Sequence, residues 1–267
     1  LDAAFDAGLN GGVEAVALQA DGKVVVGGSF SLAGAVPRHG LARLHTNGTL
    51  DVSFAPSLPV YARVTALAVQ PDGKVLAAVE GMTQDHSLTH LLRFLPDGAL
   101  DVGFPLPVSD ATDASVRDIV VQPDGKILVS GTFRAVNGVP PRSIARLLSD
   151  GTVDASFDAG GDIYFVADLA LQPDGRIVVL GGVYQVGEVL WDGVVRLMPD
   201  GSRDTGFVGG KSCCLSTLAL QTDGKILIGG GFRAYNGATC NGVARLHSDG
   251  NLDVSFVTGE GISPIDD

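Results

Sequence analysis

The 267-residue sequence lacks three features that would point to a particular class of protein. Its 18 basic and 30 acidic residues leave a net charge of −12, which repels phosphate backbones and anionic lipid, so we expect no nucleic-acid partner. No apolar run approaches the roughly 18 residues that span a bilayer, so we expect no membrane insertion. No signal peptide is recognisable and residue 1 is a leucine, and we interpret the chain as part of a longer protein.

Cysteine is also scarce, with only Cys213, Cys214 and Cys240. The sequence allows one disulfide in an exported protein, for which we favour Cys214–Cys240, or three unbonded thiols. A metal or catalytic role is disfavoured because no histidine is paired with these cysteines.

The sequence contains instead a phrase of the form Gln-x-Asp-Gly-Lys/Arg, repeated about every 50 residues. Its five copies begin at Gln19, Gln70, Gln122, Gln172 and Gln221. Each Asp-Gly lies between short runs rich in Val, Ile and Leu, which is the pattern of a β-hairpin. A second Asn-Gly or Asp-Gly turn follows in each copy, so one repeat predicts four antiparallel strands, as in a propeller blade.

The predicted fold is therefore all-β, a β-propeller of about five four-stranded blades in a single domain over residues 1–267. The repeats cover approximately 6–54, 55–104, 105–157, 158–207 and 208–256, and residues 1–5 match the last strand of a preceding or incomplete repeat. A five-bladed ring with a spare first strand and a segment of a larger ring or array both fit this pattern.

An arginine recurs in the third strand and an aspartate in the fourth, and we predict one Arg–Asp pair per blade. In Leu95-Pro96-Asp97-Gly98-Ala99, a type I turn followed by a left-handed glycine makes Leu95 face Ala99. That register brings Arg93 opposite Asp101.

The two phrases together, Ala-Leu/Val-Gln-Pro-Asp-Gly-Lys and Ala-Arg-Leu-x-x-Asp-Gly-x-Leu-Asp-x-Ser-Phe, resemble the delta-60 repeat β-propeller family. The resemblance covers the chain from Leu1 to Phe256. It implies a propeller of bacterial origin that is secreted or held at the cell surface, with no settled biochemical activity.

Both tight turns lie at one end of each blade, so the variable loops lie at the other, where propeller ligands tend to bind. The candidates for contact with a glycan or protein partner are aromatic residues in these loops and polar residues beside them. They are Tyr61, Tyr164, Trp191, Tyr235, Arg233 and Asn236. The alternative is that each aromatic ring covers the edge of its own blade.

Two weaker sites come from residues present in only some repeats. Asp85, His86 and His90 have a spacing that suits a metal ion, although ordinary surface loops often look the same. Asp118 and Asp168 are carboxylates of inner strands, where they could act as a catalytic pair in a central channel or serve the fold.

The sequence thus favours a non-catalytic binding or scaffold propeller without a cofactor. The alternatives are a glycoside hydrolase-like enzyme with carboxylates in the channel, and a purely structural array on a cell surface.

Overall fold

The computed structural model describes residues 7–81, 90–104, 115–133, 143–161, 163–185, 188–210, 212 and 214–256. Every extended regular element among them is a β-strand, and none of these residues forms a helix that could cross a membrane. The chain divides into two compact units, each described by itself. The first comprises Leu1–Val129, Phe133–Pro140 and Arg146–Val153, and the second Ser130–Thr132, Pro141–Ala145 and Asp154–Asp267.

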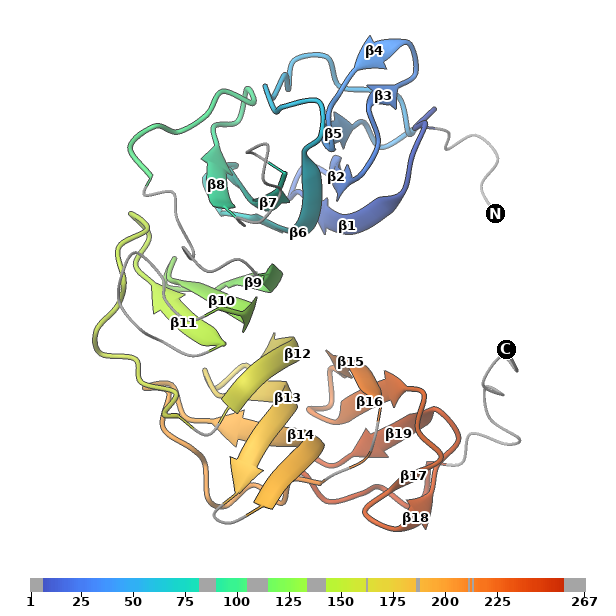
Figure 1. The fold of residues 1–267 in the computed structure, drawn as a ribbon, viewed down its shortest axis with the longest axis vertical. Coiled ribbons are helices and arrows are strands. Elements are labelled where there is room, and N and C mark those ends of the chain that lie inside the picture. Colours follow the sequence, from blue (N-terminus) through green and yellow to red (C-terminus); the bar gives the residue numbers. More distant parts are fainter. Residues whose placement is uncertain are drawn as a thin grey trace. The chain divides into compact units, whose positions relative to one another are not determined.

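Each repeat forms one three-stranded sheet with its second strand in the middle (Figure 1). The first unit holds β1 (Val13–Leu18), β2 (Val24–Gly28) and β5 (Leu41–Leu44), then β6 (Arg63–Val69), β7 (Val75–Glu80) and β8 (His90–Phe94). The division into units passes through the third sheet, formed by β9 (Ser115–Val121), β10 (Ile127–Thr132) and β11 (Ile144–Leu147). The second unit holds β12 (Ile163–Leu171), β13 (Ile177–Gln185) and β14 (Glu188–Leu197), then β15 (Leu215–Leu220), β16 (Ile226–Gly230) and β19 (Val243–Leu246).

Two small hairpins extend from the first and the last sheet. They are β3 (Leu32–Ala33) with β4 (Val36–Pro37), and β17 (Ala234–Tyr235) with β18 (Ala238–Thr239). Each occupies the connection between the second and third strands of its repeat, which is where the sequence predicts a loop.

The middle strands of the first three sheets are almost wholly buried on both faces, as expected where sheets pack face to face, whereas β16 of the last sheet contains partly exposed residues. In β7, five successive residues from Val75 to Val79 are fully buried. The neighbouring first strand β6 alternates instead, with Val64, Ala66 and Ala68 buried and the residues between them partly exposed. This difference explains why the second strand of each repeat is a continuous apolar run.

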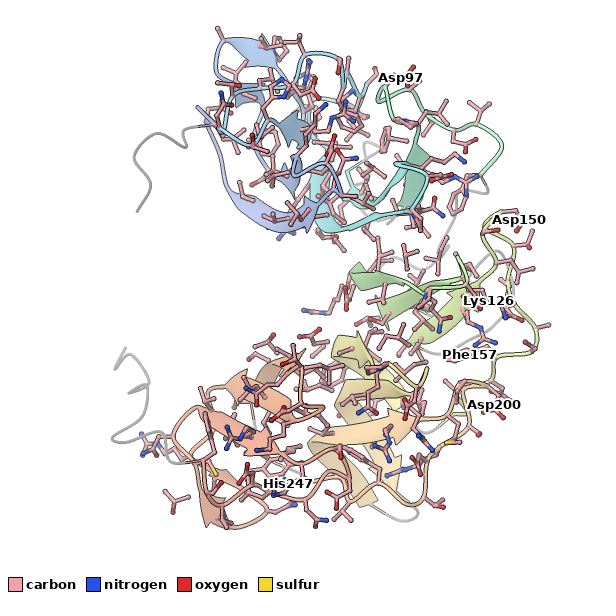
Figure 2. All side chains as sticks on the ribbon, turned by 180° about the vertical axis from the view of Figure 1, so that it is seen from behind. Asp97, Lys126, Asp150, Phe157, Asp200 and His247 are labelled. Carbon is pink, nitrogen blue, oxygen red and sulfur yellow. The ribbon has the colours of Figure 1, made fainter. Side chains whose placement is uncertain are left out.

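The predicted turns are confirmed. The N–H of Leu95 donates to Ala99 O at 2.8 Å and the N–H of Gly98 to Leu95 O at 2.8 Å. Gly98 has φ of 91°, the left-handed region that favours glycine. The N–H of Asp101 donates to Arg93 O at 2.8 Å, as the predicted register requires. Figure 2 shows Asp97, the aspartate of this turn, with Asp150 and Asp200 at the same position of later repeats.

The predicted fourth strand is not confirmed, because among the described residues it shrinks to a single bridge between the third strand and the residue before the recurring aspartate. In the first repeat this bridge joins Leu44 and Leu50. The next residues fold back because the Asp51 carboxylate accepts hydrogen bonds from the N–H and the hydroxyl of Ser53, at 3.0 and 2.6 Å. The N–H of Phe54 donates to Asp51 O. Such local bonds compete with a strand ladder, so Asp-x-Ser-Phe forms a turn.

This turn joins one repeat to the next. Phe54 is fully buried in a core cluster that also contains Leu41 of its own repeat and Val64 of the next. The Arg43 guanidinium lies 4.8 Å from the centre of the Phe54 ring. Arg43 also donates from Nη1 to Pro96 O, in the second turn of the next repeat, at 2.8 Å.

A backbone bond completes the contact between successive repeats. The N–H of Ala55 donates to Asp97 O at 2.9 Å, and Gly98 lies so close that an added Cβ would be 2.6 Å from Ala55 N. Equivalent bonds run from Asp158 to Asp200 and from Val208 to Asp249.

Candidate functional site

Each sheet has two unlike ends. The turn end carries the Gln-x-Asp-Gly hairpin and the second Asp-Gly or Asn-Gly turn, and its hydrogen bonds repeat with little change. The loop end carries the connection between the second and third strands and the start of the first strand. It differs between repeats: short hairpins occur in the first and fifth, whereas β13 and β14 continue outward to Gln185 and Glu188 in the fourth.

The predicted Arg–Asp pairs lie at the turn end and are confirmed in four repeats. The Nε atoms of Arg43, Arg93, Arg196 and Arg245 lie within 2.8–2.9 Å of Oδ2 of Asp51, Asp101, Asp204 and Asp253. Burial alone would raise the pKa of Asp51, but hydrogen bonds from Ser53, Lys23 and Arg43 outweigh it and hold the pKa well below its usual range. Each pair joins the third strand of its repeat to the turn that follows it.

In the first unit, the loop end exposes an aromatic and an aliphatic side chain beside an ion-pair cluster. Tyr61 is 76% exposed and Val60 is 64% exposed. The neighbouring Arg63 pairs with Glu14 of the first repeat at 2.8 Å and with Glu80 of the second at 3.1 Å. The hydrogen bond to Glu14 raises the pKa of Arg63 above its ordinary value, against the smaller opposing effect of burial.

In the second unit, the prediction that Tyr235 is an exposed ligand-binding residue is wrong. Tyr235 is fully buried in the core cluster of the last sheets, and burial raises the pKa of its phenol well above the usual range. Its ring lies over Gly210, where an added Cβ would be 2.2 Å from Cζ. Arg233 and Asn236, which flank β17, are exposed.

Tyr164 and Trp191 are the other two aromatic candidates for ligand contact in the second unit. Tyr164 is half-buried, and its ring lies over Gly182, where an added Cβ would be 2.1 Å from Cζ. It therefore covers its own sheet, which is the alternative role considered for these rings. Trp191 belongs to β14, and its side chain is outside the described part of the structure.

The weak catalytic candidates lie in different units. Asp168 serves the fold: its Oδ2 accepts the Thr217 hydroxyl and the N–H of Leu218, both at 2.8 Å, and so joins β12 to β15. Asp118 accepts the N–H of Ile119 at 2.8 Å. Each is described within its own unit.

The metal candidates are only partly described. Asp85 and His86 lie outside the described residues. His90 begins β8 half-buried, and burial lowers its pKa. The residues that the structure describes contain no group of three His, Cys, Asp or Glu side chains suited to a metal ion.

The structure does not contain the favoured Cys214–Cys240 disulfide. Cys240 packs against the core cluster of the last sheets, whereas Cys214 is exposed just before β15 with φ of 65°. The two thiols therefore occupy different environments despite lying in the same repeat.

Sequence reasoning missed the cluster of Glu14, Arg63 and Glu80. A usable signal was present at Arg63, since the other copies carry uncharged residues there, namely Gly12, Ser115, Phe165 and Cys214. Val60 was missed because an isolated valine in a linker gives no signal.

Comparison with known proteins identifies the repeat. Five segments, residues 19–54, 70–104, 122–157, 172–207 and 221–256, match the family described as "Domain of unknown function (DUF5122) beta-propeller". They cover more than half of the chain and confirm a β-propeller repeat family, without the narrower delta-60 designation. No curated protein sequence matches the chain.

Solved structures show the same fold at low sequence identity. PorZ, a bacterial surface component of the type-IX secretion system of Porphyromonas gingivalis, matches with TM-score 0.55 and 12% identity over 96% of this chain, which spans 36% of PorZ. The PQQ-bound aldose sugar dehydrogenase of Streptomyces coelicolor matches with TM-score 0.52 and 15% identity, covering 99% of this chain and 94% of the enzyme. A puromycin hydrolase matches with TM-score 0.50 and 18% identity, and the match covers 93% of this chain and 40% of the hydrolase.

Proposed function

The chain belongs to the DUF5122 β-propeller family, and from that premise we propose that it is a non-catalytic binding or scaffold module. Its five repeats are the blades of a propeller whose loop ends hold a glycan or a protein partner. The observation that carries the proposal is the contrast between the two ends of each sheet. The recurring polar groups are engaged within the fold at the turn end, whereas the loop end varies and exposes Tyr61, Arg233 and Asn236.

The binding surface of the first unit is centred on Tyr61. An exposed aromatic ring stacks on the apolar face of a sugar or anchors a protein partner at little entropic cost. The Arg63 guanidinium beside it is held in place by Glu14 and Glu80, so it can donate hydrogen bonds without first being ordered. In the second unit, the β17–β18 hairpin presents Arg233 and Asn236 from a rigid base, because Tyr235 fixes that hairpin to the core.

The proposed location is outside the cell or on its surface, in a bacterium. The likeness of fold to a surface component of a secretion system supports this location but does not carry over that protein's role.

A hydrolase-like enzyme using Asp118 and Asp168 has less support. One Asp168 oxygen already accepts two hydrogen bonds from the next repeat, which is the geometry of a residue that joins strands. The enzymes among the solved structures share the fold at identities that carry no catalytic residues across.

The test is a glycan-array and surface-protein binding screen of the full chain beside Tyr61→Ser. The matched control is Val102→Ser, which changes a side chain that is 87% exposed at the turn end. We expect the Tyr61 variant to lose about tenfold or more in affinity while the control binds like the parent. Both variants should melt with the parent, since both side chains are exposed.

Absence of any ligand in both screens would contradict the proposal. Turnover of a glycoside by the parent, lost in Asp168→Asn at unchanged melting temperature, would favour the enzyme instead.

A further inference from the structure

The tight turns of this chain are built on a chemically labile dipeptide, asparagine or aspartate followed by glycine. Glycine has no side chain to shield its backbone nitrogen, which can therefore attack the amide or carboxyl carbon of the side chain before it. Such pairs form both turns of every repeat. Elsewhere in the described residues, asparagine–glycine pairs begin at Asn10, Asn236 and Asn241, and a further pair, Asn137–Gly138, lies outside those residues.

At the turn end, a recurring hydrogen bond protects these pairs. In both turns of every repeat, the N–H of the glycine donates to the carbonyl three residues earlier, at 2.8–3.0 Å. Attack on the preceding side chain requires this nitrogen to lose its proton and to turn toward the side-chain carbon, so the bond opposes both steps. In the Asn47–Gly48 turn, Asn47 Oδ1 also accepts the N–H and the hydroxyl of Thr49, at 3.1 and 2.7 Å.

Two of the other asparagine–glycine pairs are held in different ways. The N–H of Gly242, which follows Asn241, donates to Phe232 O at 2.8 Å. Asn10 Oδ1 accepts the N–H groups of Ser31 and Leu32 at 2.9 and 2.8 Å, and these bonds fix the side-chain carbonyl. In each case one of the two reacting groups is already engaged.

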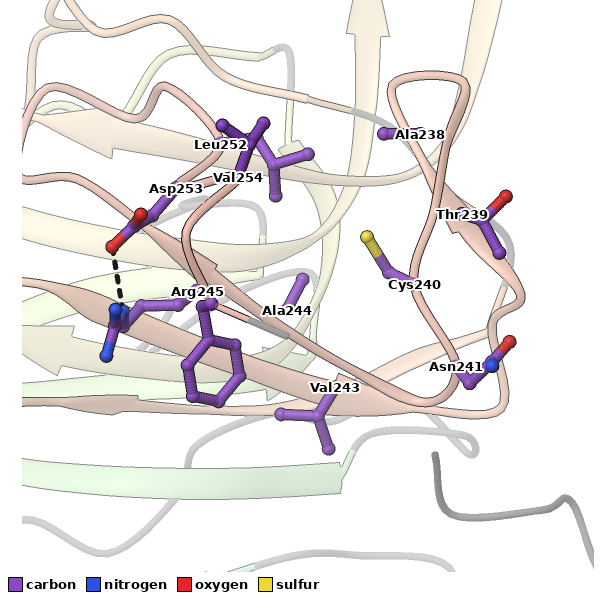
Figure 3. A pocket seen from close by; sticks show the side chains of 11 residues that line it. Ala238, Thr239, Cys240, Asn241, Val243, Ala244, Arg245, Leu252, Asp253 and Val254 are labelled. Atoms are coloured by element: carbon purple, nitrogen blue, oxygen red, sulfur yellow. Dashed lines mark hydrogen bonds and ion pairs between the residues drawn. The ribbon is translucent and has the colours of Figure 1, made fainter. Parts of the chain in front are cut away.

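The pair Asn236–Gly237, at the tip of the β17–β18 hairpin, lacks this protection. Figure 3 shows the chain returning from this tip through Ala238 and Thr239. The φ values of Asn236 and Gly237 are 49° and 81°, as in a type I′ turn, whose central N–H groups take no part in strand pairing. The N–H of Gly237 donates to no acceptor among the described residues. Apart from its chain neighbours, no described residue lies within 4 Å of the position that an added Cβ would take.

The tip can rearrange while the rest of the repeat stays folded. The hairpin has only two residue pairs, Ala234 with Thr239 and Tyr235 with Ala238, and it is separate from the three-stranded sheet. The buried Tyr235 ring anchors its base. Opening the tip therefore breaks no hydrogen bond of the main sheet, whereas freeing a turn-end glycine breaks the turn itself.

We infer that Asn236–Gly237 is a site of spontaneous deamidation. The Gly237 nitrogen forms a bond to Cγ of Asn236, the bond from Cγ to the side-chain nitrogen breaks, and that nitrogen leaves as ammonia with the proton from Gly237. Water then opens the succinimide at either carbonyl and gives aspartate or isoaspartate. The product adds a negative charge to the hairpin that carries Arg233, and isoaspartate also lengthens the main chain at the tip. Because this step needs no ligand, it is tested independently of the proposed binding function.

The test follows the asparagines of the folded, full chain during incubation at mildly alkaline pH. Trypsin cleaves after Arg233 and Arg245, so one peptide contains both Asn236 and Asn241, and its fragment spectrum assigns the mass gain to one of them. We expect Asn236 to convert about tenfold or more faster than Asn47 and Asn241. Labelling with isoaspartyl methyltransferase should locate isoaspartate at position 236.

Two controls separate the effect of the fold from that of the local sequence. In guanidinium chloride, where the turn bonds are lost, Asn47, Asn236 and Asn241 should convert at similar rates. The double variant Asn236→Gly/Gly237→Ala has the Gly-Ala tip of the β3–β4 hairpin and should abolish the mass gain of the peptide. Equal rates at Asn236 and Asn47 in the folded chain, or no conversion at Asn236, would overturn the inference. A faster rate at Asn236 that persists in guanidinium chloride would also overturn it.

Discussion

The turn end and the loop end of these sheets are made by the same chain but respond to sequence change in opposite ways. At the turn end, Arg43, Asp51 and Phe54 contact one another and the next repeat, so each side chain depends on the others. At the loop end, Val60 and Tyr61 extend into solvent from a linker. In this chain, a residue that recurs in every repeat has a structural role. Candidate functional residues are therefore those at positions where the repeats differ.

The largest loss of stability is expected from truncating the most buried side chain of the turn end. Phe54→Ala removes a fully buried ring between two repeats and should lower the free energy of unfolding by about 3–5 kcal/mol. Tyr61→Ala, an aromatic truncation at the loop end, should change it by less than about 0.5 kcal/mol. Urea denaturation of both variants measures the contrast, and similar losses would show that the two ends do not differ in this way.

Removing the turn-end charge should cost somewhat less and should change the response to pH. Asp51→Asn leaves the buried Arg43 without its anion and should cost about 3 kcal/mol at pH 7. The folded-state pKa of Asp51 is below its unfolded value of about 3.9, so its stabilisation is present above that pH and is lost as pH falls further.

Denaturant melts of parent and variant between pH 5 and pH 2 check the sign. The parent should lose more stability on acidification than Asp51→Asn, because Asp253 and the other paired aspartates remain in both chains. Parallel curves would mean that Asp51 titrates alike in the folded and unfolded states.

The smallest of these effects is expected where the β17–β18 hairpin of the loop end is anchored to the core by Tyr235. Gly210→Ala places a methyl group against the Tyr235 ring and should cost about 1–3 kcal/mol. The double variant Gly210→Ala/Tyr235→Ala should lose less stability than the sum of the losses of the two single variants, because removing the ring relieves the clash. Thermal melts of both single variants and the double variant give the coupling, and strict additivity would show that the ring moves aside freely.

Much of the fold could be predicted because the sequence repeats. The Asp-Gly turns, the hairpin register of Arg93 with Asp101 and the all-β class follow from residues within five to ten positions of one another, where local geometry decides. The fourth strand could not be recognised as a turn, because the apolar alternation of Leu50 and Val52 suits a strand equally well. The outcome depends on whether the Asp51 carboxylate bonds to Ser53, which the pattern does not reveal.

The candidate site was less predictable because side-chain exposure depends on contacts between distant residues. Tyr61 and Tyr235 look alike as loop tyrosines, yet one is 76% exposed and the other 0%. The difference comes from Gly210, 25 positions before Tyr235, whose missing side chain makes room for the ring. Asp168 looked like a channel carboxylate until Thr217 and Leu218 of the next repeat were seen to donate to it.

The bond from Ala55 to Asp97, with Gly98 closed against it, has a consequence for how such a chain can change over generations. The segment that ends one repeat fits against the second turn of the following repeat, so each contact needs residues from two successive repeats. A duplication or deletion of a whole repeat, about 50 residues long, restores every such contact at the new junction. A duplication or deletion whose length is not a whole number of repeats leaves such a segment without its turn. Gain or loss of DNA in whole-repeat steps is therefore the form of length change that this architecture tolerates.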